Sequence, residues 1–243
     1  MLDWLFPHKC VVCLDILTSS PNDGFCKACK DTLMKIAEYC DVCGRPLTHG
    51  YTCECEGRVF EFTKNRSVFV YDDVMSNVIY AFKYGNHPAH GKALGKTMAR
   101  HFDFYFKGID LRHCLIIPTP MFRPKERLRG FNQADILARE IARYTGILYD
   151  NKSLLRIRDT AAQSGLSAEE REINLANAFK LSRMPSPVAG KTILLVDDIL
   201  TTGSTLNKCA AELLRGGAAS VYGYTLSATV KIKKKYSANN LIV

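Results

Sequence analysis

The residues best suited to chemistry stand together late in the chain, where the apolar run Ile193–Val196 ends in two adjacent acids, Asp197 and Asp198. This pattern predicts a buried strand with the acids at its carboxyl end, where open α/β sheets bind their ligands. A loop of small residues and the start of a helix follow. The N–H groups there can hold a phosphate, because Gly203 lets the backbone come close. The paired carboxylates repel a phosphate but accept hydrogen bonds from hydroxyl groups beside it, so the stretch indicates a site for a ribose 5-phosphate.

Two other interpretations of this stretch explain less of it. A nucleotide-binding P-loop requires Gly-Lys-Ser/Thr at the end of the loop, and the loop lacks that sequence. A purely structural interpretation makes the stretch a buried strand followed by a helix, with Asp198 or Thr201 as the N-cap. It gives no reason for two adjacent acids at the end of an apolar strand.

Eight of the ten cysteines precede residue 56, and they fall in pairs. A Cys-x2-Cys pair aims two thiolates at one metal, and two such pairs close a tetrahedral site that leaves no position for water. This ligand set fits structural zinc, with an iron–sulfur cluster as a minor alternative. We expect sequential pairing, although cross-braced pairing is open. The predicted ligands are Cys10, Cys13, Cys26 and Cys29 for one zinc and Cys40, Cys43, Cys53 and Cys55 for the other.

The last pair is less regular than the others, because Cys53 and Cys55 are separated by a single residue and His49 is nearby as an alternative ligand. A module of this length has little core of its own, so the metal would supply most of its folding energy. The two remaining cysteines, Cys114 and Cys209, stand in apolar or helical contexts and are expected in the core.

Length and charge narrow the class of protein. A chain of 243 residues can hold one medium domain and a small module. It has no apolar run long enough for a membrane span, and its N-terminus lacks the features of a secretory signal, so we expect a cytoplasmic protein. The net charge of +9 favours phosphate-bearing partners, including nucleic acid. The run Lys231–Lys235 is either a solvated tail or a contact to a nucleic-acid backbone.

Apolar periodicity between these motifs predicts alternating strands and helices, which is typical of a mainly parallel α/β sheet flanked by helices. Strands are expected at Ser67–Tyr71, Leu115–Ile117, Ile193–Val196 and Ser220–Leu226. Helices are expected from the cap Asp72 or Asp73 to Lys83, around Ala93–Phe106, at Gln133–Tyr144, from Ser167 onwards, and at Leu206–Arg215.

Two further segments are expected to border the ligand. Four cations fall within Arg123–Arg129, directly after the strand expected at Leu115–Ile117. A basic loop there, together with the acidic strand end, would bracket a ligand that is both phosphate and sugar; the alternative is a solvated surface loop. The stretch Leu155–Leu166 is polar, basic and contains glycine, so we expect a mobile loop that excludes water from the site.

The acidic pair and the loop after it resemble the phosphoribosyl-pyrophosphate (PRPP) loop of the type I phosphoribosyltransferases. The resemblance implies that Asp197 and Asp198 hold the ribose hydroxyls and would steady the ribose as positive charge develops during transfer. It also implies that PRPP arrives with Mg2+. The residues that would hold the 5-phosphate are Thr201, Thr202, Gly203, Ser204 and Thr205.

The same resemblance assigns the other end of PRPP. It implies that Thr119 and the Arg123–Arg129 segment, with Arg129, face the pyrophosphate. Lys83 and Arg158 are candidate contacts to this leaving group. No acceptor pocket and no general base can be identified from the sequence.

Four features occur in one order and extend the resemblance over nearly the whole chain. They are the paired cysteines, Phe82-Lys83-Tyr84-Gly85, the segment RGFNQA at 129–134, and Arg158-x-Thr160-x-x-Gln163-x-x-Leu166 before VDDILTTGST. Together they resemble the ComF (ComFC) family of bacterial competence proteins; the close spacing of Cys53 and Cys55 departs from the expected pattern. The resemblance implies a zinc-ribbon module at 1–58 and a phosphoribosyltransferase-like domain at 59–243. It further implies a role in natural transformation, with single-stranded DNA and other competence proteins as partners.

Three functions are consistent with these motifs. The first is an enzyme that transfers a phosphoribosyl group from PRPP. The second is a DNA-binding module without turnover, in which Phe131, Tyr84 or aromatic residues of the ribbon stack on bases. The third is a nucleobase-salvage phosphoribosyltransferase with an added ribbon. The acidic pair favours a ribose ligand, because DNA lacks the 2-hydroxyl that a carboxylate would bind.

Overall fold

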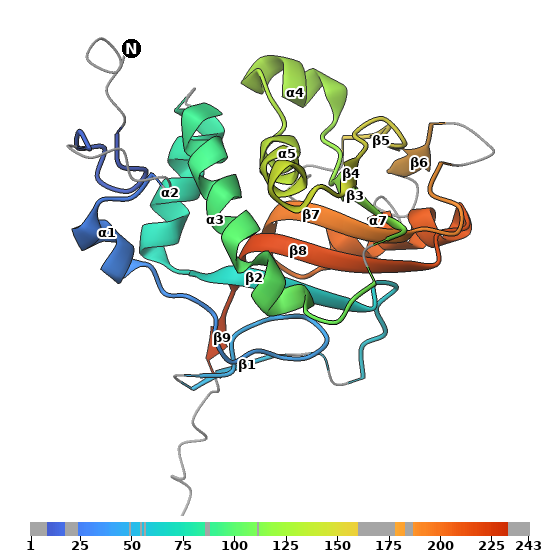
Figure 1. The fold of residues 1–243 in the computed structure, drawn as a ribbon, viewed down its shortest axis with the longest axis horizontal. Coiled ribbons are helices and arrows are strands. Elements are labelled where there is room, and N and C mark those ends of the chain that lie inside the picture. Colours follow the sequence, from blue (N-terminus) through green and yellow to red (C-terminus); the bar gives the residue numbers. More distant parts are fainter. Residues whose placement is uncertain are drawn as a thin grey trace, which may run out of the picture.

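The computed structural model describes residues 9–17, 24–48, 50–53, 55, 57–85, 88–110, 112–159, 178–182 and 187–232. At its centre lies a five-stranded sheet in which every neighbouring pair is parallel (Figure 1). The order across the sheet is β2 (Lys64–Tyr71), β8 (Ser220–Thr229), β7 (Thr192–Leu200), β3 (Cys114–Pro118) and β4 (Leu148–Tyr149). The prediction of a mainly parallel α/β sheet is confirmed.

Apolar side chains on both faces of β7 divide the interior into two cores. Leu194 and Val196 belong to the core under the helices α2 (Asp73–Tyr84), α3 (Pro88–Phe106) and α5 (Gln133–Thr145). Ile193 and Leu195 belong to the opposite core, which includes the buried side chains of α7 (Ser204–Arg215). A strand that is buried on both faces has a continuous apolar sequence. Burial of each such side chain stabilises the folded state by about 1.5–3 kcal/mol.

The helices begin where side chains can satisfy their first N–H groups. Asp72 caps α2 by accepting a 2.8 Å hydrogen bond from the N–H of Met75. Asn132 caps α5 by accepting from the N–H of Ala134 at 3.1 Å. The helix α7 has Gly203 at its N-cap and no side-chain cap, so the alternative that made Asp198 or Thr201 the cap is wrong.

The basic segment after β3 differs from its prediction. It forms a short helix, α4 (Arg123–Arg129), and not a loop. Pro124 occupies the first turn, where a missing N–H costs nothing, and Gly130 ends the helix in the left-handed conformation at φ 86°. The density of cations predicts a loop, but Pro124 and Gly130 are typical helix-boundary residues and favour the short helix.

Strand register brings the ends of β3 and β7 together. Pro118 lies opposite Val196, and the N–H of Thr119 donates to the Val196 carbonyl at 2.8 Å. On the other side of β7, Asp197 lies opposite Thr225 of β8. The acidic pair therefore lies within the last part of β7, beside the segment that follows β3.

The cysteine-rich segment packs along the edge of the sheet. The N–H of Ile36 donates to the carbonyl of Val68 on β2. The N–H of Val70, also on β2, donates to the carbonyl of Met34. Farther along, β1 (Tyr51–Thr52) pairs antiparallel with β9 (Lys231–Ile232), directly after β8 (Figure 1). The other small elements are α1 (Lys27–Thr32) and the antiparallel pair β5 (Leu154–Arg156) and β6 (Phe179–Leu181).

Some sequence predictions lie outside the described residues. They are most of the loop predicted at Leu155–Leu166, the helix predicted from Ser167, the alternative ligand His49, and Lys233–Lys235 of the basic tail. Within the described ranges, none of the helices combines the length and the apolar character that crossing a membrane requires.

Candidate functional site

A pocket of about 230 Å³ lies at the carboxyl ends of β3 and β7. Most residues that the sequence predicted for a ribose-phosphate ligand line it, namely Lys83, Thr119, Arg129, Asp197, Asp198, Thr201 and Thr205. Thr202, Gly203 and Ser204 form the loop between the last two of these. Arg158 is exposed and lies outside the lining of this pocket. The structure thus brings together residues from four separate stretches of the chain.

The acidic pair carries two unlike carboxyl groups. Asp198 forms an ion pair with Lys83, with 2.8 Å between Oδ2 and Nζ. Asp197 accepts the N–H of Asp198 at 2.9 Å. Burial and, second, the neighbouring charge of Asp198 raise the pKa of Asp197 to about 7, although Lys83 opposes this shift. Near neutral pH the pair therefore has one carboxylate held by a cation and one carboxyl poised to lose its proton.

The loop after β7 has the geometry expected of a phosphate cradle. Gly203 adopts φ 85°, a conformation that side chains other than glycine rarely take. The hydroxyls of Thr202 and Ser204 lie 2.8 Å apart, and the N–H of Ser204 donates to the Thr202 oxygen at 3.3 Å. The first N–H groups of an α-helix have no partner within the helix, so those of α7 are available to an anion.

Two buried polar atoms in the pocket wall have no hydrogen-bond partner within the described part of the chain. They are Oγ1 of Thr119 and Nε2 of Gln133, on residues that are only 6% and 2% exposed. Leaving such a group unpaired costs about 1–3 kcal/mol. A polar ligand in the pocket would remove this cost, so both atoms indicate the same binding site as the acids.

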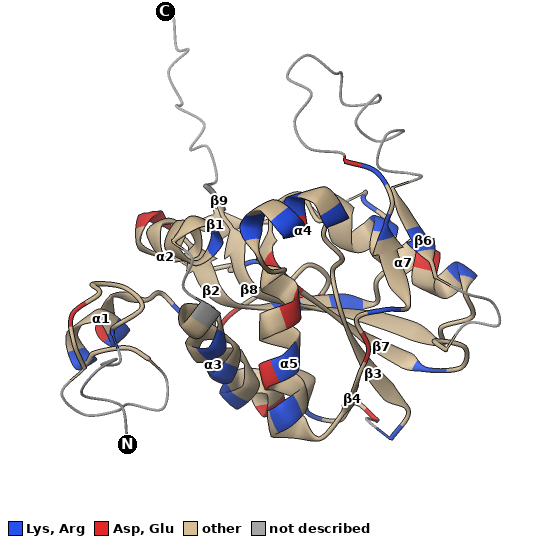
Figure 2. Cartoon of the chain, turned by 90° about the horizontal axis from the view of Figure 1, so that it is seen from above, with Lys and Arg blue, Asp and Glu red and all other residues tan. Residues whose placement is uncertain are grey.

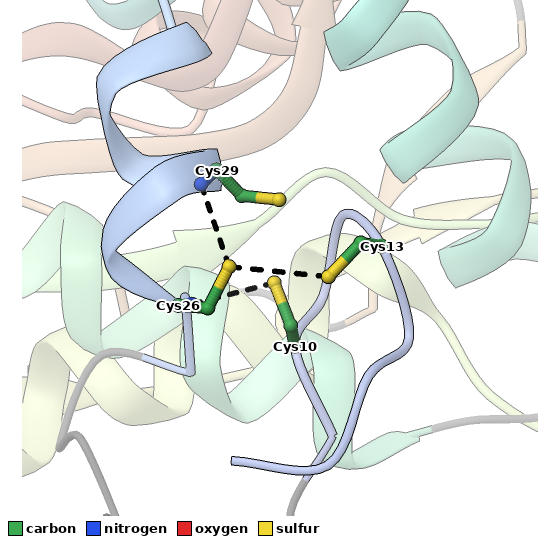
Figure 3. Close-up of side chains that lie close together, drawn as sticks. All are labelled: Cys10, Cys13, Cys26 and Cys29. Carbon is green, nitrogen blue, oxygen red and sulfur yellow. Dashed lines mark hydrogen bonds between the residues drawn. The ribbon is translucent and has the colours of Figure 1, made fainter. Parts of the chain in front are cut away.

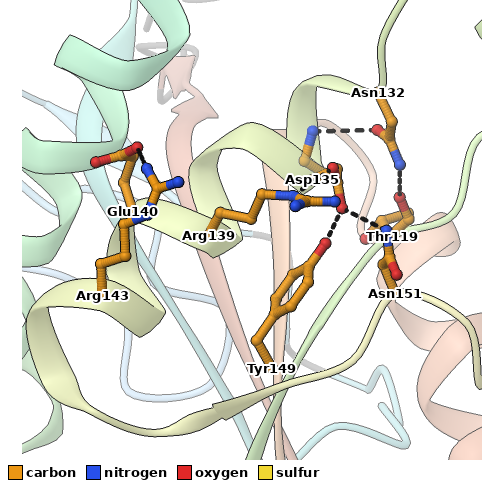
Figure 4. A network of polar contacts seen from close by, with 9 residues as sticks. Thr119, Asn132, Asp135, Arg139, Glu140, Arg143, Tyr149 and Asn151 are labelled. Carbon is orange, nitrogen blue, oxygen red and sulfur yellow. Dashed lines mark hydrogen bonds and ion pairs between the residues drawn. The ribbon is translucent and has the colours of Figure 1, made fainter.

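Asn132 and Gln133 are pocket residues that the sequence analysis did not assign. Asn132 caps α5 and also donates from Nδ2 to the Thr119 carbonyl at 3.0 Å (Figure 4). Gln133 accepts from Nη1 of Arg129 at 2.7 Å, which orients that guanidinium. The signal was present in the segment RGFNQA, where two amides follow the basic helix directly.

A polar network beside the pocket holds α5 against β4 and the residues that follow it. Asp135 accepts hydrogen bonds from the Tyr149 hydroxyl, from Nε of Arg139 at 2.9 Å and from Nδ2 of Asn151 at 3.1 Å (Figure 4). Because Asp135 lies one helical turn after Asn132, this network fixes the end of α5 that positions Thr119.

The first cysteine group fits a zinc ion. The four sulfur atoms of Cys10, Cys13, Cys26 and Cys29 lie within 4.8 Å of one another (Figure 3). The Sγ atoms of Cys13 and Cys26 are 3.9 Å apart, close to the spacing of about 3.8 Å that a tetrahedron with Zn–S bonds of about 2.3 Å requires. The N–H of Cys26 points at the sulfur of Cys10, and the N–H of Cys29 points at that of Cys26. Such contacts stabilise thiolates.

The second group, Cys40, Cys43, Cys53 and Cys55, has the same compact arrangement. The eight cysteines thus group in the sequential order in the structure, the arrangement that sequential pairing predicts. Four thiolates complete each site, so both fit structural zinc that stabilises the module and leaves no ligand position for water. Cys114 and Cys209 are buried in the core, as predicted.

The second metal knuckle is tied to the phosphate loop by a buried guanidinium. Arg45, two residues after Cys43 and only 3% exposed, donates through Nη2 to the carbonyl of Thr201 and through Nε to that of Thr229 at 3.1 Å. The turn before it packs closely against β2, because a Cβ atom on Gly44 would lie only 2.4 Å from the carbonyl oxygen of Asn65. The backbone of the phosphate loop thus rests on the ribbon.

Comparison with known proteins agrees with this arrangement. Residues 1–56 match the family profile of the double zinc ribbon domain, and residues 128–238 match that of the phosphoribosyl transferase domain. The chain is 31% identical to the DNA utilization protein YhgH of Salmonella typhimurium over 92% of this chain and 98% of that protein. It is also 31% identical to competence protein F of Haemophilus influenzae, over 91% and 97%, and to competence protein ComFC of Bacillus subtilis, over 85% of each chain.

These matches, with the fold and the two cysteine centres, define a protein that joins a double zinc ribbon to a phosphoribosyltransferase-like domain. Sequence identity above 30% to these relatives over nearly the full length narrows the assignment from a domain combination to one family. The chain belongs to the ComF family of competence proteins.

The two zinc centres are expected to differ in their effect on the rest of the protein. Cys13 is exposed, whereas Cys43 is 1% exposed and lies in the same core as Leu200. We expect two zinc ions per wild-type chain by elemental analysis and one in each of the variants Cys13→Ser and Cys43→Ser. Only Cys43→Ser should lower the melting temperature of the sheet domain markedly. Equal losses of melting temperature in the two variants would contradict this.

Replacing Arg45 should loosen the phosphate loop without removing zinc. In Arg45→Ala the carbonyls of Thr201 and Thr229 lose charged donors, each worth about 1.5–3 kcal/mol. Amide hydrogen exchange within 201–205 should become faster, while elemental analysis still finds two zinc ions. Arg112→Ala, at a guanidinium that is mostly exposed, is the matched control. Unchanged exchange in Arg45→Ala would show that the contact does not hold the loop.

Asp197 should cost stability as the pH rises. The native state favours its protonated form, and the unfolded chain has its ordinary pKa of 3.8, so stability falls from about pH 4 until the pH passes about 7. Asp197→Asn avoids this cost. Its gain in unfolding free energy should be about 1 kcal/mol larger at pH 8 than at pH 6, measured by urea denaturation. Asp103→Asn, at an exposed acid, should show no such difference; a gain independent of pH at position 197 would refute the assignment.

Proposed function

We propose that this protein binds PRPP at the β3–β7 pocket and acts in natural competence by handling single-stranded DNA in the cytoplasm. The observation that carries the first part is the meeting of an acidic pair, a phosphate loop and unpaired buried polar atoms in one pocket. The second part is supported by relatives named competence protein F, competence protein ComFC and DNA utilization protein. The net charge of +9 suits a nucleic-acid partner.

The pocket residues have complementary tasks in this proposal. The 5-phosphate lies in the loop 201–205, and the ribose hydroxyls donate to Asp197 and Asp198. The pyrophosphate faces the unpaired Thr119 oxygen, the Gln133 amide and Arg129. Lys83, which is paired with Asp198 at 2.8 Å, is within reach of the same ligand. Mg2+ bound with PRPP would neutralise charge on its phosphates.

The acidic pair favours binding of the ribose ligand of the proposal and disfavours binding of DNA in the same pocket. DNA has no 2-hydroxyl to offer these carboxylates, and its phosphates are repelled by them. We therefore infer that DNA binds at a different surface from the ribose 5-phosphate group. We also infer that the ribbon module, at 1–58, supports the phosphoribosyltransferase-like domain at 59–243.

A second candidate function is favoured by one observation. A larger cavity of about 740 Å³ adjoins the pocket and shares Pro120, Met121 and Asn132 with it. An acceptor held there would lie beside bound PRPP, as a nucleobase-salvage transferase requires. Release of pyrophosphate on adding free nucleobases to the protein with PRPP and Mg2+ would support this function, and no release would remove it.

Calorimetric titration of PRPP, with and without Mg2+, tests the main proposal. We expect the wild-type protein to bind, and the variant Asp197→Asn/Asp198→Asn to bind at least tenfold more weakly, because hydrogen bonds to charged acceptors contribute about 1.5–3 kcal/mol each. Ribose 5-phosphate should compete better than 2-deoxyribose 5-phosphate.

The control for this titration is Asp103→Asn, which removes an acidic charge from an exposed position on α3. It should bind PRPP as the wild type does. Failure of the wild type to bind, or equal binding by the doubly substituted protein, would overturn the proposed ligand.

A further inference from the structure

Two exposed tyrosines form a ladder on the solvent side of α2. Tyr80 and Tyr84 are 66% and 62% exposed, and their ring centroids are 4.9 Å apart. They are four residues apart, so they lie on one face of the helix. The opposite face buries Met75, Ile79 and Phe82 in the core. The tyrosines therefore contribute little to the core, and their faces are accessible to a ligand.

Arg129 links this ladder to the ribose-phosphate pocket. Its guanidinium carbon lies 5.1 Å from the centre of the Tyr84 ring, and its Nη2 is 3.4 Å from the Tyr84 hydroxyl. The same guanidinium contacts Gln133 in the wall of the pocket. The aromatic surface thus begins at the edge of the pocket, at the residue that follows Lys83.

The helix α4 is rich in Lys and Arg (Figure 2), and its last residue, Arg129, contacts Tyr84 of the ladder. Arg123 and Arg127 are exposed, lie one turn apart and form no ion pair within the described ranges. Lys125, by contrast, is paired with Asp159 at 2.8 Å. Two unpaired guanidinium groups on α4, whose last residue contacts Tyr84, and two exposed, mutually tilted aromatic rings match a ligand that carries both flat bases and phosphates.

The other aromatic residues considered for base stacking are less suited to it. Phe131 packs against Phe82, with ring centroids 5.7 Å apart, at the border of the core. Tyr39 of the ribbon lies against Tyr105 and under the guanidinium of Arg66. Phe131 and Tyr39 are each partly buried against the core, whereas Tyr80 and Tyr84 are 66% and 62% exposed, with Arg129 over one face of Tyr84.

We propose that Tyr80 and Tyr84 bind single-stranded DNA by stacking on its bases, while Arg123 and Arg127 of α4 contact its phosphates. The strand must be single, because bases in a duplex are stacked on each other and cannot offer their faces. This inference rests on the DNA-handling part of the proposed function and is independent of PRPP binding. It places the DNA beside the pocket and leaves the pocket itself to the ribose ligand.

Fluorescence anisotropy of labelled oligo(dT) with the full-length protein tests the ladder. The variant Tyr80→Ala/Tyr84→Ala should bind roughly five- to hundredfold more weakly, since alanine substitution of a stacking residue has an effect of that order for each base. The dependence of its affinity on salt should stay as in the wild type. Tyr144→Ala, at a tyrosine of α5 that is 55% exposed, is the matched control and should bind normally.

A second variant separates stacking from charge. Arg123→Gln/Arg127→Gln should reduce the slope of log affinity against log salt by about 1.4, or about 0.7 for each phosphate contact. Both double variants should keep the wild-type melting temperature. The pocket variant Asp197→Asn/Asp198→Asn should still bind oligo(dT) while it loses PRPP, so a failure here is distinguishable from a failure of the ribose-phosphate site. Unchanged oligo(dT) binding in the tyrosine variant, an unchanged slope in the arginine variant, or equal binding of duplex DNA by the wild type would overturn the proposal.

Discussion

The buried guanidinium of Arg45 is the contact on which the arrangement of the site most depends. It spans from the turn of a metal knuckle to two carbonyls, one at the start of the phosphate loop and one at the end of the neighbouring strand. A buried charge of this kind is tolerated only where its donors are satisfied. The knuckle, the loop and the end of β8 therefore form one unit, and the metal that shapes the knuckle also shapes the binding site at a distance.

The pocket contains groups whose free energy is unfavourable in the free protein and that a bound ligand would satisfy. A carboxyl group with its pKa raised to about 7 stands beside an ion pair, and two buried polar atoms in the wall lack partners. Each feature lowers the stability of the free protein. Active and binding sites tolerate such costs because the same groups then interact more strongly with a ligand than with their own chain.

Much of this arrangement could be predicted from the sequence because it depends on local pattern. The run ILLV followed by two acids identified β7 and placed the acids near its carboxyl end, and the spacing of cysteines identified both groups of four sulfur atoms. The helix at Arg123–Arg129 was missed because its evidence lies at its boundaries, in Pro124 and Gly130, and its interior looks like a charged loop. Asn132 and Gln133 were missed for another reason. Their roles depend on contacts with Thr119 and Arg129, which only the folded chain brings near.

The pairing of β1 with β9 has a consequence for how the chain is made. It joins residues 51–52 to residues 231–232, so the ribbon gains these neighbours only after the strands of the central sheet have been made. Contacts this distant in sequence form slowly, because a long loop must close before they contribute any stability. During translation the N-terminal knuckles can capture metal early, yet Arg45 must wait for Thr201 and Thr229 to emerge. A chain that ended before Thr201 would therefore leave the Arg45 guanidinium without either of these carbonyls.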